Sequence, residues 1–449
     1  MPDFKTLTRQ ANANLRFEEP LAPGDPRLTD LSQVRGDFHE SKLLYQLGIL
    51  EANDPLVDAE RRQYLLFGGH RGCGKSTALR QLKEKLHRPD RFFVVLIDAL
   101  EALDINNLRY SDVVLAQAKG LFDALQEGAI EIDQIFLDRL ENWFDQRVLS
   151  KSSTTDFAAS IEGMARVRGG IPWLAELFVK LQSAIKTNST YKDEIRTEVR
   201  NHFSDFAAAF NQLIRHAEEQ IARRDLGKRL LFIVDGTDRL RGEDAERFFV
   251  GDVHQLQLIE SIFVYCAPIT LMSEKSLHGF EPFRLPMIKI GEKSTNYDPS
   301  SLVAKTLKRL IAKRMSMELF EDGGTVDYLI EHSGGHIRDL IRLLRYALRE
   351  AQSRQVTREM ARQAVTQLAS EYSRLIEQDD YELLARIDSQ PPDYAPVSAK
   401  TRRLLYDLIL LEYNTYWWQT HPVVKSLPAY RRASEEPGPR TSAIPGERD

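Results

Sequence analysis

This chain is organised around the stretch Leu65-Leu66-Phe67-Gly68-Gly69-His70-Arg71-Gly72-Cys73-Gly74-Lys75-Ser76-Thr77. The stretch joins a short apolar run to a glycine-rich turn, and a lysine and two hydroxyl residues follow the turn. Gly69, Gly74, Lys75 and Ser76 match the pattern G-x-x-x-x-G-K-[ST]. In this pattern backbone N–H groups curl round phosphate oxygens, the lysine neutralises their charge, and the hydroxyl can ligate Mg²⁺. The stretch therefore predicts a phosphate-binding loop.

The sequence on both sides of the loop supports this prediction. Residues 63–67 are apolar and aromatic enough for a buried strand, and residues 77–86 have the composition of a helix. A strand, a loop and a helix in this order are the structural context that confirms the motif. We therefore expect the nucleotide to contact Gly69, His70, Arg71, Gly72, Cys73, Gly74, Lys75, Ser76 and Thr77.

Composition places the chain among soluble globular proteins of two or three domains. It has 449 residues, of which 42% are apolar and 28% are charged. A net charge of −5 gives no global argument for nucleic acid or for an acidic membrane. The two cysteines, Cys73 and Cys266, cannot form a disulfide framework, which favours a reducing cytoplasm. No run approaches the roughly 20 apolar residues of a membrane span, so we expect a cytoplasmic protein without membrane contact.

Three further short apolar runs predict strands buried on both faces of a parallel sheet. They lie at residues 91–98, 229–238 and 261–268. The first follows the loop helix closely enough to make a βαβ unit. A long, mostly helical insertion at about residues 105–226 separates the first run from the second. The predicted fold class is α/β, with a parallel-sheet core interrupted by this insertion.

Helical periodicity is clearest inside the insertion. Apolar residues recur by threes and fours from residue 191 to 224, which predicts one helix about 50 Å long. A second apolar stripe at 132–144 predicts an antiparallel partner for it. Between them, residues 171–181 are amphipathic. Their aromatic residues fit either packing inside the domain or contact with a partner or membrane surface.

The remaining chain predicts a modular order. Residues 300–376 are wholly helical in pattern, and residues 398–414 predict a helix that a β-ribbon at 415–424 follows. A helix with an aromatic hairpin is compatible with a small winged-helix module. We expect an extended arm at 1–30, a nucleotide-binding core at 31–299, a helical lid at 300–376, a C-terminal module at 377–430 and a disordered tail at 431–449.

The phosphate loop needs an acidic partner that holds Mg²⁺. Asp235 ends a buried strand, and the sheet would place its carboxylate at the carboxyl edge beside Ser76. We therefore predict Ser76 and Asp235 as the metal site. Asp238 could orient the attacking water or cap the next helix, and both interpretations stay open. Asp98 also ends a strand, and we expect it to be structural.

At this point the chain resembles the AAA+ and related STAND nucleotide-switch ATPases, particularly the branch similar to origin-recognition proteins. The resemblance covers about residues 31–375. Residues 69–77 look like the Walker A motif and residues 230–238 like Walker B. Val34-Arg35-Gly36 looks like the adenine-side motif, which implies that Arg35 contacts the nucleotide. Residues 333–340 look like the sensor-2 region, which implies that Arg338 reaches the phosphates.

The resemblance implies an ATPase that binds ATP and Mg²⁺ and assembles with copies of itself. Lys75, Asp235, Asp238 and Arg338 would then be its catalytic residues. Thr270 is the candidate for sensor 1 at the nucleotide, and Arg284 is the candidate arginine finger for a neighbouring subunit. Because the second acid is displaced from the usual Asp-Glu pair, a slow ATPase or a pure switch remains open.

Two functions of different classes fit such a protein. One is a nucleotide-controlled switch in signalling or defence that acts through protein partners or an effector. The other is a DNA-associated loader or transposition-type ATPase, and a nucleotide-binding scaffold with negligible hydrolysis is a third hypothesis. Arginines recur along one predicted helix at spacings that fit either phosphate contacts with duplex DNA or a solvated face with one nucleotide-sensing arginine. The four are Arg338, Arg342, Arg345 and Arg349.

Overall fold

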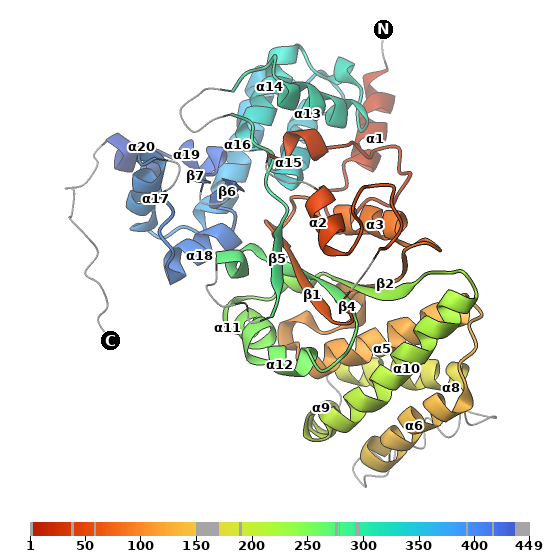
Figure 1. Cartoon of the computed structure of the whole chain (residues 1–449). Helices are drawn as coiled ribbons and strands as arrows, with labels where there is room; N and C mark the ends of the chain where they lie inside the picture. Colours follow the sequence, from red (N-terminus) through yellow and green to blue (C-terminus); the bar gives the residue numbers. More distant parts are fainter. Residues whose placement is uncertain are drawn as a thin grey trace. The chain divides into compact units, whose positions relative to one another are not determined.

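The computed structural model describes residues 3–36, 40–57, 60–149, 170–187, 191–273, 277, 279–291, 297–391, 394–414 and 417–435 (Figure 1). The chain divides into two compact units. We call residues 39–68 and 75–284 the sheet unit. We call residues 1–38, 69–74 and 285–449 the helical unit.

A five-stranded sheet in the order β2-β3-β4-β1-β5 forms the centre of the sheet unit. The pairs β1–β5, β2–β3 and β3–β4 are parallel. The strands are β1 (Gln63–Gly69), β2 (Phe92–Asp98), β3 (Arg229–Asp235), β4 (Ile262–Pro268) and β5 (Glu281–Arg284).

The first four strands confirm the strands that the apolar runs predicted, and they are almost wholly buried. The sequence did not predict β5. This strand is only four residues long, contains Pro282, and pairs with β1 at the edge of the sheet. Proline is tolerated in edge strands because the missing N–H costs no ladder hydrogen bond there. The fold class is therefore α/β with a parallel sheet, as expected.

Helices pack on this sheet at close range. α3 and α5 contact β2, and α10 contacts β3. A Cβ atom on Gly120 of α5 would lie 3.1 Å from side-chain atoms of Val95 and Ile97, so the glycine lets α5 approach β2. The helices of this unit are α2 (Glu40–Gln46), α3 (Lys75–Leu86), α4 (Ala99–Ala102), α5 (Tyr110–Glu127), α6 (Gln134–Phe144), α8 (Ile171–Lys186), α9 (Lys192–Asn201), α10 (Phe203–Arg223), α11 (Gly242–Glu246) and α12 (Val253–Leu256).

The described part of the insertion is helical, and α6 runs antiparallel to α10 as predicted. Trp143 meets Phe206 with ring centroids 5.2 Å apart, while Phe136 at the other end of α6 stacks on His216 at 4.4 Å. The single helix predicted for 191–224 is wrong, because the chain leaves the helical conformation at His202 between α9 and α10. The apolar stripe continues across this break, so periodicity alone could not reveal it.

Residues 171–181 pack inside the sheet unit. α8 lies against α5, where Phe178 stacks on Phe122 with ring centroids 5.5 Å apart. Trp173 and Phe178 are both buried. The first of the two interpretations of this amphipathic segment is therefore confirmed. Among the described residues, none of the helices combines the length and the apolar content needed to cross a bilayer.

The helical unit begins with a helix where we expected an extended arm. Residues 4–14 form α1, and Asp3 caps it by accepting from the N–H groups of Lys5 and Thr6. The prolines on which the prediction depended all lie downstream of α1. The other helices of the unit are α13 (Leu302–Ala312), α14 (Gly323–His332), α15 (Ile337–Ala351), α16 (Arg358–Ser373), α17 (Asp380–Ser389), α18 (Ala399–Tyr406), α19 (Pro422–Lys425) and α20 (Pro428–Glu435).

The C-terminal part of this unit differs from the prediction in two places. The helix predicted for 398–414 ends at Tyr406, because Leu408 adopts a left-handed φ of 63°. Residues 410–414 instead form β6 (Leu410–Asn414), which pairs antiparallel with β7 (Trp417–Thr420). The first residues of the predicted disordered tail, 431–435, belong to α20, and the rest of that tail lies outside the described residues.

Candidate nucleotide site

The chain passes directly from β1 through residues 70–74 into α3, which begins at Lys75. Gly72 and Gly74 have φ values of 84° and 104°, a conformation that side-chain-bearing residues rarely adopt. A Cβ atom on Gly74 would also lie 3.1 Å from Nη2 of Arg35. The backbone of the loop therefore requires glycine at 74, which belongs to the motif, and at 72, which does not, and the predicted strand, loop and helix are confirmed.

In the sheet unit, the first turn of α3 meets the end of β3. Ser76 Oγ donates to Asp235 Oδ1 at 3.0 Å, and Lys75 Nζ lies 2.8 Å from Asp238 Oδ2. Lys75 is buried, with 4% of its surface exposed. The four side chains for which we predicted phosphate and metal chemistry are thus brought together in the sheet unit.

Asp235 has the environment of a carboxylate that would benefit from a cation. Burial raises the pKa of Asp235, and the neighbouring negative charges of Asp238 and Asp98 raise it further, whereas the hydrogen bond from Ser76 lowers it. A divalent cation would offset this crowding of negative charge. A carboxylate and a hydroxyl are also hard oxygen donors of the kind that Mg²⁺ prefers. The residues present fit the Mg²⁺ site that the sequence predicted.

The two neighbouring aspartates have different contacts. Asp98 pairs with Asp235 in the register of β2 and β3, and its carboxylate caps α4 by accepting from the N–H of Leu100 at 2.9 Å. This is the kind of structural role that we expected. Asp238 forms an ion pair with Lys75, which neither of the two interpretations of Asp238 anticipated.

In the helical unit, Arg35 lies against the phosphate loop. Its guanidinium donates to the Cys73 carbonyl at 2.6 Å and to the Pro286 carbonyl at 2.9 Å. Only 6% of its surface is exposed, and burial lowers its pKa from the ordinary value. Arg35 therefore positions the loop backbone.

Arg338 also lies beside the loop, through its backbone. Its N–H donates to the Gly72 carbonyl at 3.3 Å, and a Cβ atom on Gly72 would lie 2.8 Å from that of Arg338. His336 approaches even more closely, because its Nε2 lies 2.6 Å from the Arg71 carbonyl oxygen. The sequence pointed to this segment for Arg338 but gave no sign that His336 contacts the loop.

Two side chains of the loop, those of His70 and Arg71, contact residues of β6 and α18 within the helical unit. His70 is 1% exposed, and its Nε2 accepts from the backbone N–H of Glu412 in β6 at 2.8 Å. The guanidinium of Arg71 lies over the ring of Tyr406 at 5.5 Å. Phosphate contacts from His70 and Arg71 would therefore come from their backbone. Contacts between positions 342 residues apart cannot be read from a local motif.

The remaining candidates lie at the expected positions along the chain, but their roles stay predictions. Thr77 is half-buried in the first turn of α3, and Thr270 is half-buried in the short helical turn that follows β4. Arg284 ends β5, where its guanidinium donates to the carbonyl of Met272 in the same chain. An arginine finger at this position would have to give up that contact.

Comparisons with known proteins add little to this geometry. No family model matches the chain, and no curated protein sequence matches it. Among solved structures, the chain is similar to Cdc6p from Pyrobaculum aerophilum over 91% of this chain and 98% of that one, at 14% identity and a TM-score of 0.34. A TM-score this low does not support any inference about the function of this chain. The parallel sheet, the loop after β1 and the acidic end of β3 nevertheless make the fold that of an α/β P-loop NTPase.

Proposed function

We propose that this protein is an ATPase of the AAA+ type that binds ATP with Mg²⁺ and acts as a nucleotide-controlled conformational switch. The observation that carries the proposal is the meeting of α3 with β3. Ser76 Oγ donates to Asp235 Oδ1 at 3.0 Å immediately after a loop of the phosphate-binding pattern. Lys75 would neutralise the phosphates, and Ser76 and Asp235 would hold Mg²⁺.

The sequence around Asp235 favours slow turnover. The next residue is Gly236, with a left-handed φ of 87°, so no carboxylate directly follows the metal acid. Asp238, in the short helical turn after β3, is the nearest later acid, and its carboxylate is paired with Lys75. A group that is to orient the attacking water must first be released from this pair. Slow hydrolysis suits a switch, whose bound state must persist while partners respond.

We further propose that the switch works in signalling or defence, through self-assembly and protein partners. The sequence argument for the alternative, a DNA-associated loader, was the row of arginines on α15. These arginines have partners within the chain: Arg342 lies 2.8 Å from Asp339 Oδ1, and Arg345 lies over the ring of Phe17 at 5.2 Å. This row of arginines therefore lends the DNA alternative little support.

Calorimetric titration of the full chain with MgATP tests nucleotide binding. We expect the wild type to bind, Lys75→Ala to abolish detectable binding, and removal of Mg²⁺ with EDTA to weaken it. Asp235→Asn should impair Mg²⁺-dependent turnover, measured as phosphate release. Asp244→Asn is the control, because the Asp244 carboxylate of α11 is partly exposed and pairs with Arg247 at 3.5 Å. Micromolar binding by Lys75→Ala would overturn the loop assignment.

A second experiment separates the switch from the loader. We expect MgATP to change the mass of the assembled protein in light scattering, while duplex DNA leaves hydrolysis unchanged. If duplex DNA binds with an affinity that falls steeply with salt and also stimulates hydrolysis, the loader function replaces the switch.

A further inference from the structure

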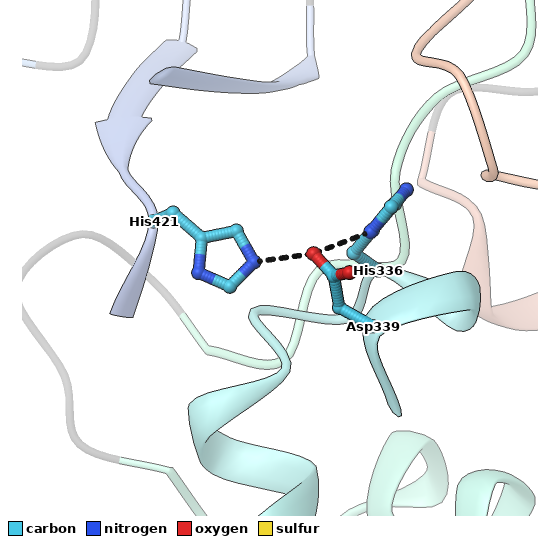
Figure 2. Close-up of side chains that lie close together, drawn as sticks. All are labelled: His336, Asp339 and His421. Atoms are coloured by element: carbon cyan, nitrogen blue, oxygen red, sulfur yellow. Dashed lines mark ion pairs between the residues drawn. The ribbon is translucent and has the colours of Figure 1, made fainter. Parts of the chain in front are cut away.

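A buried polar cluster in the helical unit connects the phosphate loop with the C-terminal hairpin. Its centre is Asp339 on α15, which faces His336 and His421 (Figure 2). Asp339 Oδ2 lies 3.0 Å from His336 Nδ1 and 3.2 Å from His421 Nε2. All three side chains are fully buried. A cluster of this kind must satisfy its charges internally, because burying an unpaired charge is costly.

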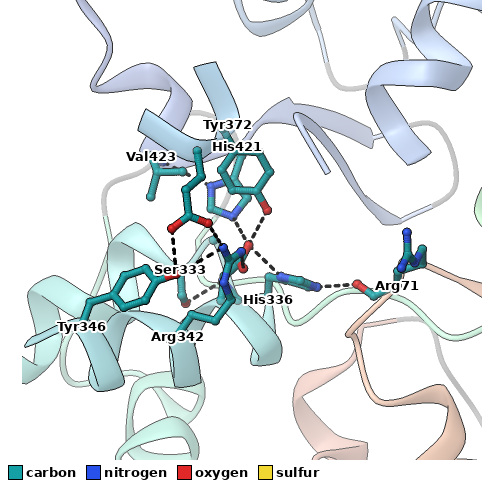
Figure 3. A network of polar contacts seen from close by, with 12 residues as sticks. Arg71, Ser333, His336, Arg342, Tyr346, Tyr372, His421 and Val423 are labelled. Atoms are coloured by element: carbon teal, nitrogen blue, oxygen red, sulfur yellow. Dashed lines mark hydrogen bonds and ion pairs between the residues drawn. The ribbon is translucent and has the colours of Figure 1, made fainter. Parts of the chain in front are cut away.

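Two more donors complete the surroundings of Asp339. Tyr372 OH donates to Oδ2 at 2.6 Å, and Arg342 Nη1 donates to Oδ1 at 2.8 Å (Figure 3). Burial alone would raise the pKa of Asp339, but His336 and His421 lower it well below the ordinary value. Asp339 is therefore an ionised carboxylate surrounded by donors.

The tautomer of His421 follows from its other ring nitrogen. His421 Nδ1 accepts from the backbone N–H of Val423 at 3.2 Å, so it cannot carry a proton. The only ring proton of neutral His421 then sits on Nε2 and faces Asp339. Burial lowers the pKa of His421, which agrees with a neutral ring.

This tautomer argues against a metal ion in the cluster. Two histidine nitrogens and a carboxylate lie close enough together to suggest one. However, a metal on His421 Nε2 would displace the proton that the contact with Val423 requires there, and the guanidinium of Arg342 would repel the ion. The arrangement suits a hydrogen-bonded ionic cluster better than a metal centre.

The donor role of His336 follows from its contact with the loop. Its Nε2 lies 2.6 Å from the carbonyl oxygen of Arg71, and a carbonyl oxygen can only accept. His336 therefore donates a hydrogen bond from Nε2 to the phosphate loop. Its other ring nitrogen, Nδ1, lies 3.0 Å from Asp339 Oδ2, so the imidazole lies between the loop and this carboxylate.

This hydrogen bond orients a peptide group of the loop. In a trans peptide the C=O and the following N–H point in opposite directions. Holding the Arg71 carbonyl toward α15 therefore turns the Gly72 N–H to the opposite side. A Cβ atom at position 72 would lie 2.7 Å from His336 Nε2, so Gly72 leaves the space that the imidazole needs. The motif itself does not require a glycine at this position.

We propose that His336 is a positioning residue for the phosphate loop. Its Nε2–H fixes the Arg71–Gly72 peptide, and Asp339 orients its imidazole. His421 and Tyr372 hold Asp339 in turn, so the hairpin region supports the site. This inference rests on the proposed nucleotide binding at the loop and goes beyond it, because it assigns a role to residues outside the nucleotide motifs.

The test compares two amides of different length at position 336. His336→Gln places an N–H donor near the position of Nε2, whereas His336→Asn cannot reach the Arg71 carbonyl. Loss of this hydrogen bond should weaken MgATP binding by about tenfold. We therefore expect His336→Asn to lose about tenfold in affinity by calorimetry, and His336→Gln to remain within about threefold of wild type.

Controls separate this role from a general effect on folding. His332→Gln changes a half-buried histidine of the helical unit, whose Nδ1 contacts the Tyr328 carbonyl of its own helix at 2.9 Å. It should leave MgATP affinity unchanged. Melting temperatures of the nucleotide-free variants show whether each remains folded. Equal affinities for His336→Asn and wild type would overturn the proposal, as would equal losses for the Asn and Gln variants.

A second readout keeps the proposal testable if the proposed function fails. If neither wild type nor Lys75→Ala binds MgATP, the nucleotide function is wrong. Hydrogen–deuterium exchange of the peptides covering residues 69–75 then tests whether His336 positions the loop. Faster exchange in His336→Asn than in His336→Gln supports positioning of the loop, and identical exchange contradicts it. A stoichiometric transition metal found in the purified protein and removed by a chelator would also overturn it.

Discussion

At the scale of single residues, Lys75, whose ammonium group would bind a nucleotide phosphate, already forms an ion pair with Asp238. Their side chains are 3% and 13% exposed and 2.8 Å apart. A phosphate group must compete with the Asp238 carboxylate for the same ammonium. Nucleotide binding therefore includes the cost of breaking a mostly buried pair, and removing the carboxylate should change both stability and affinity.

We predict that Asp238→Asn lowers the stability of the nucleotide-free protein and increases the stabilisation by MgADP. The variant leaves Lys75 buried without this carboxylate, which typically costs about 3–5 kcal/mol. A bound phosphate would then compensate the lysine without competition. Melting temperatures with and without MgADP measure both effects.

Asp244→Asn is the control for this comparison. The Asp244 side chain is partly exposed on α11 and lies 3.5 Å from Arg247, and a surface ion pair of this kind contributes little to stability. It should melt like the wild type under both conditions. A smaller MgADP-induced shift in Asp238→Asn than in wild type would contradict the competition.

Arg35 provides a second electrostatic argument at this scale. The guanidinium is buried and donates to the carbonyls of Cys73 and Pro286, and among the described residues no carboxylate forms an ion pair with it. A buried cation with only carbonyl partners favours the arrival of an anion nearby. The resemblance implied a contact with the nucleotide, whereas the geometry favours support of the loop.

At the scale of elements, the sequence correctly predicted those strands, helices and turns whose formation depends only on their own residues. The apolar runs predicted β1 to β4, and the glycine pattern predicted the loop between β1 and α3. Asp235 could be chosen because the end of a buried strand fixes the position of its carboxylate. These features depend on short-range pattern and on the geometry of parallel sheets.

Other elements depended on contacts that no local pattern encodes. β5 is short and contains Pro282, and its pairing with β1 lies far away in sequence. The turn at Leu408 has no glycine to announce it, so the helix prediction ran on into β6. His336 could have been suspected from Gly334-Gly335, which marks a tight turn before α15, but its partner Arg71 could not.

Gly227, just before β3, gives a prediction for the sheet itself. A Cβ atom there would lie 2.6 Å from the backbone N of Phe93 and 2.9 Å from the carbonyl carbon of Phe92. The backbone of β2 cannot move aside without disturbing its pairing with β3. Gly227→Ala should therefore destabilise the protein by about 1–3 kcal/mol in urea unfolding.

Gly251→Ala is the matched control for this clash. The nearest atom to its added methyl group would be 4.0 Å away, so the substitution should not destabilise the fold. If both variants unfold at the same urea concentration as wild type, the close approach before β3 has no energetic consequence and the prediction is wrong.

At the scale of the whole molecule, histidines whose pKa is lowered in the fold should set the pH dependence of stability below neutrality. Desolvation lowers the pKa of the half-buried His332 and of the buried His421 in the helical unit, and that of His87 in the sheet unit, although the His87 residue is largely exposed. The unfolded chain, with histidine pKa values near 6.5, then binds protons before the folded chain does. Stability is therefore unaffected well above pH 6.5 and falls as the pH drops below it.

The size of this effect can be bounded. At pH 6, a buried histidine that stays neutral in the fold lowers the free energy of unfolding by at most about 0.8 kcal/mol, and the exposed His87 contributes less because solvent screens it. Buried carboxylates such as Glu218 and Asp252, whose pKa burial raises, act in the opposite direction. They start from ordinary values of 4.5 and 3.8, well below that of histidine, so they act mainly at lower pH.

We therefore predict that the free energy of unfolding falls between pH 7.5 and pH 6, measured by urea denaturation at constant ionic strength. His87→Gln should reduce the fall, because a glutamine oxygen can accept from the Val94 N–H as His87 Nδ1 does at 3.0 Å, without taking up a proton on unfolding. The decrease in the free energy of unfolding that remains in this variant comes from histidines of the helical unit. There, protonation of His421 would place a proton on Nδ1, the nitrogen that accepts from the Val423 N–H. If stability stays constant or rises from pH 7.5 to pH 6, these imidazole rings are protonated in the folded protein. The neutral tautomer assigned to His421 would then also be wrong.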